Sequence, residues 1–422
     1  MKILVSAYTC EPGCGSEEGV GWNMVLALAK YHETWVLTRT IFRPTIEAEL
    51  VSHPVPNLHF IYFDPFNWTE DWRNKQGAVQ LHYYLWQIQA YFVARPLHQQ
   101  IGFEVIHHVT YVKFWSPSFL SLLPIPFIWG PVGGGEQFPK SFWADLSLRG
   151  KVYETLRDLA QRLGQGDPFT RLTAQRSVLA LATTAETAQR LSKLGANNVQ
   201  VLSQIGLSKL ELARLEQRPM SESFPVKFIS MGRLLHWKGY HLAVRAWAKA
   251  NLSDAEYWLL GDGAERERLQ ALAEELGVAS QIQFLGNLPR EQSLERLGEC
   301  HILVHPSLHD SGGLTCLEGM AAGRPVICLD LGGPATQVTA ETGIKVPALN
   351  PEQAVQGLAE AMKCLAGDPA LRVRLGQAGQ KRVKEIYDWD VKGEVWSQIY
   401  KGVLAQKHQP FSLNFLKQVE RH

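Results

Sequence analysis

Residues 302–329 read ILVHPSLHDSGGLTCLEGMAAGRPVICL and contain the pattern that decides the fold. Two short apolar runs are Ile302–His305 and Val326–Leu329. They lack the alternation of apolar and polar residues that is typical of a strand with one solvent-exposed face. Such runs are typical of strands that are buried on both faces of a sheet. Between them a glycine-rich loop leads into the helical pattern Thr315–Ala322. A strand, a helix and a second strand in this order predict a parallel βαβ unit.

The same rhythm extends over nearly the whole chain and occurs in two series. The first series has strand patterns at Ile3–Ala7, Thr34–Thr38, Leu58–Phe63, Val105–Val109, Phe127–Trp129, Val178–Ala182 and Val199–Leu202. The second series has them at Val226–Met231, Tyr257–Leu260, Ile282–Leu285, Ile302–His305, Val326–Leu329 and Ile344–Val346. Helical patterns lie between the strands of both series. We therefore predict an α/β protein with two Rossmann-like domains.

The length of the chain supports the same division, because 422 residues exceed the size of one hydrophobic core. The polar stretch Ser203–Ser223 separates the two series, and we interpret it as the interdomain linker. The predicted domains are residues 1–205 and 206–390. We expect the C-terminal helical stretch, residues 391–422, to join the first domain.

Composition excludes several classes of protein. The net charge of +1 gives no reason to expect a nucleic-acid partner. The apolar region Phe119–Val132 contains three prolines and is shorter than the ~20 residues that span a bilayer. The six cysteines are scattered and predict neither a zinc site nor disulfides, so we expect a reduced, cytoplasmic compartment. Residues 140–176 hold seven Lys or Arg against four Asp or Glu, a balance too even to support a membrane surface by itself. Peripheral contact with the inner face of a membrane stays open.

The loop within 302–329 has the residue types of a phosphate and sugar site. Ser311, Gly312 and Gly313 precede Leu314 and Thr315 at the start of the helix. Glycine lets the backbone approach a ligand, and the first N–H groups of a helix attract phosphate. Asp310 at the loop mouth and Glu318 one turn into the helix are unsuited to phosphate, which repels them. Carboxylates accept hydrogen bonds from sugar hydroxyls, so we predict that role for both acids.

A second loop, Gly232–Gly239, follows the first strand of the second series. Arg233 and Lys238 place two cations at the carboxyl edge of the predicted sheet. An arginine can bind two phosphate oxygens at once, and a lysine adds a compact charge. The pair predicts a site that neutralises a diphosphate without a metal ion or another cofactor.

These two loops together resemble the donor site of retaining glycosyltransferases of the GT-B fold, in glycosyltransferase family 4 (group 1). That family has a lysine five positions after the arginine, as in Arg233 and Lys238. It also has two acids separated by seven residues, as in Asp310 and Glu318, followed by a motif that matches Ala322–Val326. The resemblance covers essentially the whole chain. It implies two domains that face each other across a cleft, with the donor in the second.

The resemblance also implies roles for individual residues. Arg233 and Lys238, after Gly232, would bind the diphosphate, and Glu318 would bind the nucleotide ribose. Asp310 would contact the donor sugar, and the backbone from Phe284 to Asn287 would meet the base. Gly15 and Ser16 of the N-terminal loop would approach the reacting centre, and Glu17 or Glu18 would bind an acceptor hydroxyl. A simple packing turn is the alternative for that loop.

The sequence departs from the family in two places. The first acid is usually Glu and is Asp310 here, which is one methylene shorter. The stretch Phe127–Glu136 lacks the histidine that the family often has there. His107, His108 and Glu136 are the remaining candidates for side chains that line the cleft, and the alternative for each histidine is a satisfied core position. Aromatic side chains at Trp68, Trp72, Trp86, Trp115 and Trp143 suit sugar binding, a membrane interface or ordinary packing.

We therefore expect an enzyme that transfers a sugar from a nucleoside diphosphate sugar to a carbohydrate or lipid-linked acceptor hydroxyl, with retention at the anomeric carbon. Two alternatives remain open. One is a non-hydrolysing nucleotide-sugar epimerase on the same fold. The other is a catalytically inactive homologue that only binds nucleotide sugars, which Asp310 and the missing histidine favour.

Overall fold

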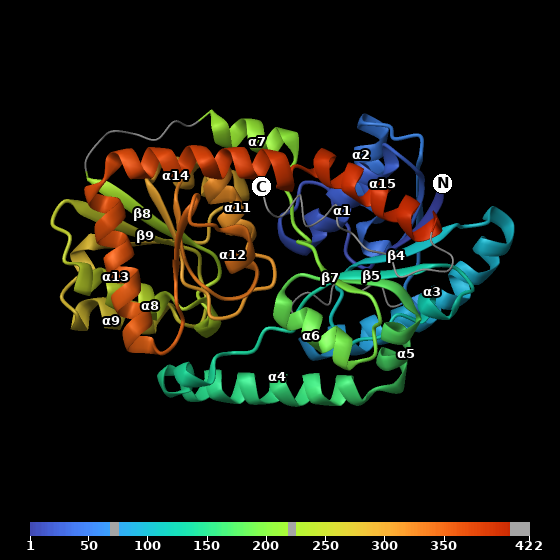
Figure 1. Ribbon diagram of the computed structural model, residues 1–422, viewed down its shortest axis with the longest axis horizontal. Helices are drawn as coiled ribbons and strands as arrows, with labels where there is room; N and C mark the ends of the chain where they lie inside the picture. The colour runs from blue at the N-terminus through green and yellow to red at the C-terminus, as the bar shows by residue number, and fades with distance from the viewer. Residues whose placement is uncertain (68–75, 218–224, 406–422) are drawn as a thin grey trace. The chain divides into compact units, whose positions relative to one another are not determined.

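The chain folds into two α/β units, each with its own parallel sheet, in the computed structural model (Figure 1). The structure describes residues 1–67, 76–217 and 225–405. Residues 1–135, 158–206 and the segment from Trp389 form the first unit, and residues 136–157 and 207–388 form the second. The predicted α/β fold class with two parallel-sheet domains is confirmed.

The first unit has seven parallel strands in the order β3-β2-β1-β4-β5-β6-β7. Their bounds are β1 Lys2–Ala7, β2 Glu33–Thr38, β3 Leu58–Tyr62, β4 Val105–Thr110, β5 Phe127–Val132, β6 Ser177–Ala182 and β7 Val199–Val201. Val5 of β1 pairs with Val36 on one side and His107 on the other. Every residue of β4 and β5 is buried, as expected for central strands of a parallel sheet that is covered on both faces.

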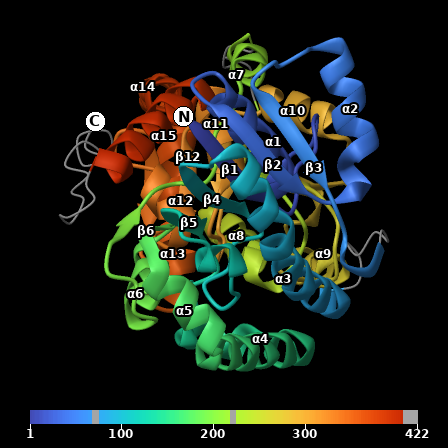
Figure 2. The same ribbon diagram turned by 90° about the vertical axis from the view of Figure 1, so that its right-hand side faces the viewer.

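Helices cover the first sheet (Figure 2). They are α1 Ser16–Ala29, α2 Arg43–Ser52, α3 Gln76–Ile101, α5 Pro168–Arg176, α6 Ala185–Lys193 and α15 Trp389–Ala405, with 3₁₀ turns at Thr40–Phe42, Pro65–Asn67 and Phe119–Leu122. The helix α15 packs against α1, and a Cβ on Gly393 would lie 2.9 Å from the carbonyl oxygen of Ala27. The C-terminal helix is therefore part of the first unit as far as Ala405, and residues 406–422 lie outside the described residues.

The second unit has six parallel strands in the order β10-β9-β8-β11-β12-β13. Their bounds are β8 Val226–Met231, β9 Ala255–Leu260, β10 Ile282–Gly286, β11 Ile302–His305, β12 Val326–Leu329 and β13 Gly343–Val346. The helices are α7 Lys209–Glu216, α8 Tyr240–Ala250, α9 Arg266–Glu275, α10 Arg290–Glu299, α11 Leu314–Ala321, α12 Gly332–Gln337, α13 Pro351–Gly367 and α14 Pro369–Arg382. Shorter turns occupy Lys140–Asp145, His236–Lys238 and Ala279–Gln281, and a π-helical turn occupies Val383–Tyr387.

The strand order of the second sheet changes direction between β8 and β11. In open α/β sheets, ligands bind outside the carboxyl ends of the strands at such a point. The loops after β8 and β11 are the two that the sequence singled out, Gly232–Gly239 and the residues up to Gly313. The fold therefore brings both loops to the position where a ligand is expected.

One segment falls in a different unit from the one that a boundary between residues 205 and 206 predicts, and the predicted linker contains a helix. Residues 136–157 belong to the second unit, because Phe138, Phe142 and Leu146 are buried in its core. The stretch interpreted as a linker, Ser203–Ser223, contains the helix α7, Lys209–Glu216, which the sequence patterns did not predict. Ser208 and Glu211 form a capping box at the start of α7, which stabilises a helix that the polar composition had concealed.

The helix α4, Leu148–Gly166, continues from the second unit into the first. Its first ten residues are counted with the second unit and the remainder with the first. The sequence patterns did not predict this helix.

Candidate donor site in the second unit

The two loops at the carboxyl edge of the second sheet contact each other directly. The backbone N–H of Leu308 donates to the carbonyl of Trp237 over 2.8 Å. Gly239 has a φ of +67°, and a Cβ there would lie 2.0 Å from the carbonyl oxygen of Pro306. A glycine is therefore required where one loop crosses the other.

An ion pair joins the loops across this contact. The Nζ atom of Lys238 lies 2.6 Å from Oδ2 of Asp310, and Nε2 of His305 lies 3.2 Å from the same oxygen. Burial raises the pKa of Asp310, but Lys238 and His305 outweigh burial and hold that pKa well below its usual range. Asp310 is therefore a carboxylate at neutral pH.

The other oxygen of Asp310 holds the glycine loop. Oδ1 accepts the backbone N–H groups of Gly312 and Gly313 over 3.1 and 3.0 Å. The structure thus pairs the N–H groups of both loop glycines with Asp310. Leu314 and Thr315 then open α11, whose N-cap Gly313 brings no capping side chain. The positive end of the helix dipole is the part of this loop that suits an anion.

Ser311 and Glu136 are brought together although the sequence had treated them separately. The Ser311 hydroxyl donates a hydrogen bond to the Glu136 carboxylate. Glu136 is buried and belongs to the segment 136–157 that packs with the second unit. The predicted candidate Glu136 therefore lies against the glycine loop of its own unit.

Glu318 lies one turn inside α11 and is held by a residue that sequence reasoning missed. The Nη1 atom of Arg290 lies 2.6 Å from Oε1 of Glu318, and its Nη2 atom lies 2.7 Å from Oε1 of Glu211. Burial raises the pKa of Glu318, and the charge of Arg290 offsets only part of that rise. Glu211 comes from α7, inside the stretch that had been interpreted as a linker.

The remaining predicted donor residues lie on the same edge of the second sheet. Gly232 has a φ of +138° directly after β8, and Arg233 beside it is exposed. Phe284 is half-buried in β10, and Asn287 is exposed just after it. Their proposed contacts with the diphosphate and the base stay predictions.

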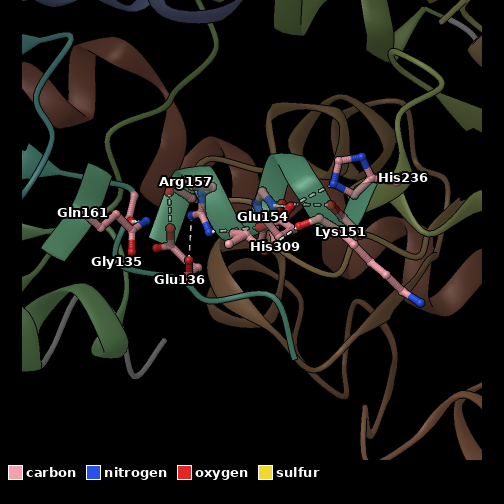
Figure 3. A network of polar contacts seen from close by, with 12 residues as sticks. Gly135, Glu136, Lys151, Glu154, Arg157, Gln161, His236 and His309 are labelled. Atoms are coloured by element: carbon pink, nitrogen blue, oxygen red, sulfur yellow. Dashed lines mark hydrogen bonds and ion pairs between the residues drawn. The ribbon is translucent and has the colours of Figure 1, made fainter. Parts of the chain in front are cut away.

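A single carboxylate on α4 contacts both loops (Figure 3). Oε1 of Glu154 lies 2.9 Å from Nε2 of His236 in the first loop and 3.2 Å from Nε2 of His309 in the second. Arg157 lies 3.5 Å from the other carboxylate oxygen of Glu154 and donates to the carbonyl of Glu136 over 2.7 Å. Burial raises the pKa of Glu154, but the hydrogen bonds from His236 and His309 outweigh it and bring that pKa to about 2.

Aromatic stacking strengthens the same junction. The indole of Trp237 lies between the ring of Tyr153, with centroids 5.0 Å apart, and the imidazole of His309, with centroids 5.5 Å apart. The sequence contained a signal for part of this arrangement, because His236 and His309 lie inside the two quoted loops. Nothing in it pointed to Glu154, which is 82 residues from His236.

The predicted candidates Gly15 to Glu18 belong to the first unit. Ser16 has a φ of +58°, a conformation that residues other than glycine rarely adopt. The Glu17 carboxylate accepts the backbone N–H of Tyr111. Burial raises the pKa of Glu17, and the nearby Lys113 ammonium offsets part of that rise. Burial also lowers the pKa of Lys113 to about 8. Gly19 supports the packing alternative for this loop, because a Cβ there would lie 2.0 Å from the carbonyl oxygen of Cys14.

His107 and His108 are enclosed in the core of the first unit. Nδ1 of His107 lies 2.6 Å from the Tyr400 hydroxyl, and Nε2 lies 2.5 Å from the carbonyl oxygen of Gly130. Nε2 of His108 lies 3.1 Å from the Tyr83 hydroxyl. Burial lowers the pKa of both histidines to about 3. These contacts are those of core histidines, which was the alternative to a role in lining a cleft.

The tryptophans of the first 143 residues favour packing where the structure describes them. Trp86 is fully buried and donates its indole N–H to the carbonyl of Phe63, and Trp143 packs against the second core. Trp115 lies against Phe114 and Gly164. Trp68 and Trp72 lie outside the described residues.

Part of the chain that includes both loops is similar to a known protein family. Residues 216–382 match the sequence model of glycosyl transferases group 1. We call residues 216–382 the group 1 segment, because they are similar to that family. The group 1 segment contains the whole second sheet and the four residues Arg233, Lys238, Asp310 and Glu318.

Several curated proteins are similar to part of the chain. The lipopolysaccharide core biosynthesis glycosyltransferase LpsD of Rhizobium meliloti is 31% identical over 173 residues, 41% of this chain and 48% of that protein. LpsE of the same organism is 31% identical over 220 residues, 51% of this chain and 62% of that protein. A glycogen synthase of Mycobacterium tuberculosis is 28% identical over 189 residues, 44% of this chain and 45% of that protein. The chain thus spans about half of the length of the curated relatives that it matches.

Solved structures resemble the chain over nearly its whole length. The sucrose-phosphate synthase of Thermosynechococcus elongatus has a TM-score of 0.65 at 19% identity and covers 96% of this chain and 100% of its own. The lipopolysaccharide outer core galactosyltransferase WaaB has a TM-score of 0.63 at 13% identity, with coverage of 95% and 100%. At these identities the likeness shows the fold, and it confirms the predicted GT-B fold. Within the described residues, we find no helix long and apolar enough to cross a membrane.

Proposed function

We propose that the protein transfers a sugar from a nucleoside diphosphate sugar to an acceptor hydroxyl, and that the second unit holds the donor. The observation that carries this proposal is the pair of Lys238 and Asp310, 2.6 Å apart, beside the start of α11. Both residues lie within the group 1 segment. A cation, an anion and a helix N-terminus at the switch point of a parallel sheet suit a ligand with a diphosphate and hydroxyl groups.

The cations assist departure of the nucleoside diphosphate. As the bond between the anomeric carbon and the diphosphate oxygen breaks, negative charge accumulates on the leaving group. Arg233, Lys238 and the start of α11 stabilise that charge, because charges that are already in place need no reorganisation during the reaction. The Lys238 ammonium has three N–H donors, so it can keep its bond to Asp310 while it binds a phosphate oxygen.

Asp310 acts in this proposal mainly through Lys238 and the glycine loop. A carboxylate has about four lone-pair sites, and Asp310 already accepts from Lys238, His305, Gly312 and Gly313. A donor-sugar hydroxyl can bond to Asp310 only by replacing one of these partners. We therefore propose that Asp310 positions Lys238 and that any sugar contact follows from an exchange of partners.

Glu318 is proposed to bind the ribose of the nucleotide. Arg290 lies 2.6 Å from one of its oxygens and favours the charged carboxylate, which accepts hydrogen bonds from hydroxyl groups. The acceptor is proposed to be a carbohydrate hydroxyl, free or lipid-linked, which the names of the LpsD and LpsE relatives support. Retention of the anomeric configuration is proposed from the family resemblance.

The test begins with a thermal-shift screen over nucleoside diphosphate sugars, because a ligand that binds only the folded state raises the melting temperature. The donor found is then used to measure transfer by Arg233→Ala and Lys238→Ala. We expect each variant to lose at least ~100-fold in turnover, as the loss of one preorganised charge contact usually does. Lys249→Ala is the matched control, since Lys249 is exposed in the last turn of α8.

Two results separate the alternatives. Conversion of the donor sugar without any acceptor would identify an epimerase in place of a transferase. Donor binding with neither hydrolysis nor transfer over a broad acceptor panel would identify an inactive binding homologue.

A further inference from the structure

The helix α4 exposes a continuous apolar stripe. Five aliphatic side chains along it are exposed by 51 to 80%: Leu148, Val152, Leu156, Leu159 and Leu163. Their spacings of four, four, three and four residues place them on one face of the helix. At a rise of ~1.5 Å per residue, the stripe is about 22 Å long. Isolated apolar side chains on a surface are ordinary, but a contiguous row of this length marks an interaction surface.

The opposite face of α4 is polar and faces the protein. Glu154 and Gln161 are both 1% exposed, and their partners are the two loop histidines and the carbonyl of Gly134, 3.1 Å away. Gly150 and Gly164 lie on the same buried face, where a Cβ on Gly164 would lie 2.3 Å from the carbonyl oxygen of Trp115. An amphipathic helix at a protein surface normally buries its apolar face. The polarity of α4 is reversed, so hydrophobic burial within the fold does not account for its leucines.

Basic side chains flank the stripe. On a helical wheel Arg149 lies along one side of it, and Lys151 and Arg162 lie along the other. Arg149 and Arg162 are exposed, and Lys151 is half-buried. The arrangement of an apolar row between basic residues is that of a helix lying in a membrane interface.

The acids of the surrounding segment are largely used inside the fold. Asp145 lies 3.1 Å from Arg245, Glu154 is buried, and Asp167 caps α5 by accepting the N–H of Phe169 over 2.8 Å. The fourth acid, Asp158, is half-buried on α4, on the same side of the helix as Lys151 and Arg162. Exposed cations in the same segment are Lys140, Arg149, Arg162, Arg171 and Arg176. The count of seven basic against four acidic residues, which by itself was too even to support a membrane surface, therefore understates the positive charge that this segment presents to solvent.

We propose that α4 docks on an anionic lipid surface, with its apolar stripe among the outer acyl chains and its flanking cations at the lipid phosphates. A second copy of the chain fits less well, because two such helices face to face would bring basic flanks together. The proposal rests on α4 alone and holds whether or not the proposed sugar transfer does. If both hold, a lipid-linked acceptor would lie in the surface that α4 binds.

The test is flotation of the full chain with phosphatidylcholine vesicles, with and without 30% phosphatidylglycerol. We expect binding to the anionic vesicles and at least about tenfold weaker binding of the double variant Leu156→Asp and Leu159→Asp, which places charge in the stripe. Leu210→Asp is the matched control, because Leu210 is 63% exposed on α7. Arg149→Gln with Arg162→Gln should weaken binding about fivefold for each charge removed, whereas Lys193→Gln with Lys249→Gln should not.

Two further measurements keep the test decisive. Melting temperatures should stay unchanged, since every substituted side chain is exposed. For a direct readout, Leu156→Cys in a Cys364→Ser background carries an environment-sensitive fluorophore, whose emission should shift to the blue on anionic vesicles. Binding that is equal in wild type and stripe variants would overturn the proposal, as would absence of binding. Sedimentation without lipid tests the remaining occupant. If the wild type forms a dimer and the stripe variant does not, the stripe binds a second copy of the chain instead.

Discussion

Lys238 and Asp310 form an ion pair of 2.6 Å between two loops that lie 72 positions apart in the sequence. The pair fixes the ammonium of Lys238 beside the start of α11 before any ligand is present.

The first prediction follows from this arrangement. Asp310→Asn removes the charge that holds Lys238 and raises the donor KM or lowers turnover by at least ~10-fold. Steady-state kinetics with a fixed acceptor measures the effect. The control is Asp254→Asn, an exposed acid just before β9, which should leave the kinetics unchanged.

Arg290 is predicted to control the charge of Glu318. Burial already raises the pKa of Glu318, and Arg290 is the cation that opposes burial. Arg290→Ala should therefore raise the pKa of Glu318 further, so that donor affinity falls as the pH is lowered and recovers as the pH is raised. Donor Kd measured from pH 6 to pH 9 tests this prediction. Arg296→Ala on the same helix, whose partner Glu299 is exposed, should give a flat profile. A flat profile for Arg290→Ala as well would remove Glu318 from the donor site.

Glu154 is predicted to position both donor loops, although we place no ligand contact on it. Glu154→Gln keeps the shape of the side chain but removes the charge that His236 and His309 contact. We expect donor affinity to fall by about tenfold. Asp158→Asn, four residues further along α4, should bind donor normally. Calorimetric Kd values distinguish the two variants. Equal donor affinity in Glu154→Gln and wild type would show that Glu154 only packs.

Stability is predicted to decrease as the pH falls, because His107 and His108 are buried in their neutral forms. The pKa of each is lowered from 6.5 to about 3. Below pH 6.5 the unfolded chain takes up protons that the folded chain binds only near pH 3. Each histidine therefore removes up to about 1.4 kcal/mol of stability per pH unit in that range. Thermal unfolding from pH 7 to pH 5 measures the slope. His107→Gln should make it shallower, whereas His53→Gln, at an exposed histidine, should not.

The sequence predicted the sheets well because buried parallel strands have an unmistakable composition. The bounds of β11 and β12 agree with the predicted runs at both ends. Two kinds of feature were not predicted from the sequence. The helices α4 and α7 have patterns that do not show an ordinary apolar face, α4 because its polarity is reversed and α7 because a capping box stabilises it. Glu154 and Arg290 contact the motif residues only because the fold brings distant segments together. Spacing along the chain does not reveal such contacts.

The central claim is that the second unit binds the diphosphate of a nucleotide sugar through Arg233 and Lys238. Titration calorimetry of wild type, Arg233→Ala, Lys238→Ala and Lys249→Ala with the donor found by thermal shift tests it most directly. We predict that wild type and Lys249→Ala bind with the same Kd and that the other two variants bind at least ~10-fold more weakly. Equal affinity in all four proteins would contradict the claim.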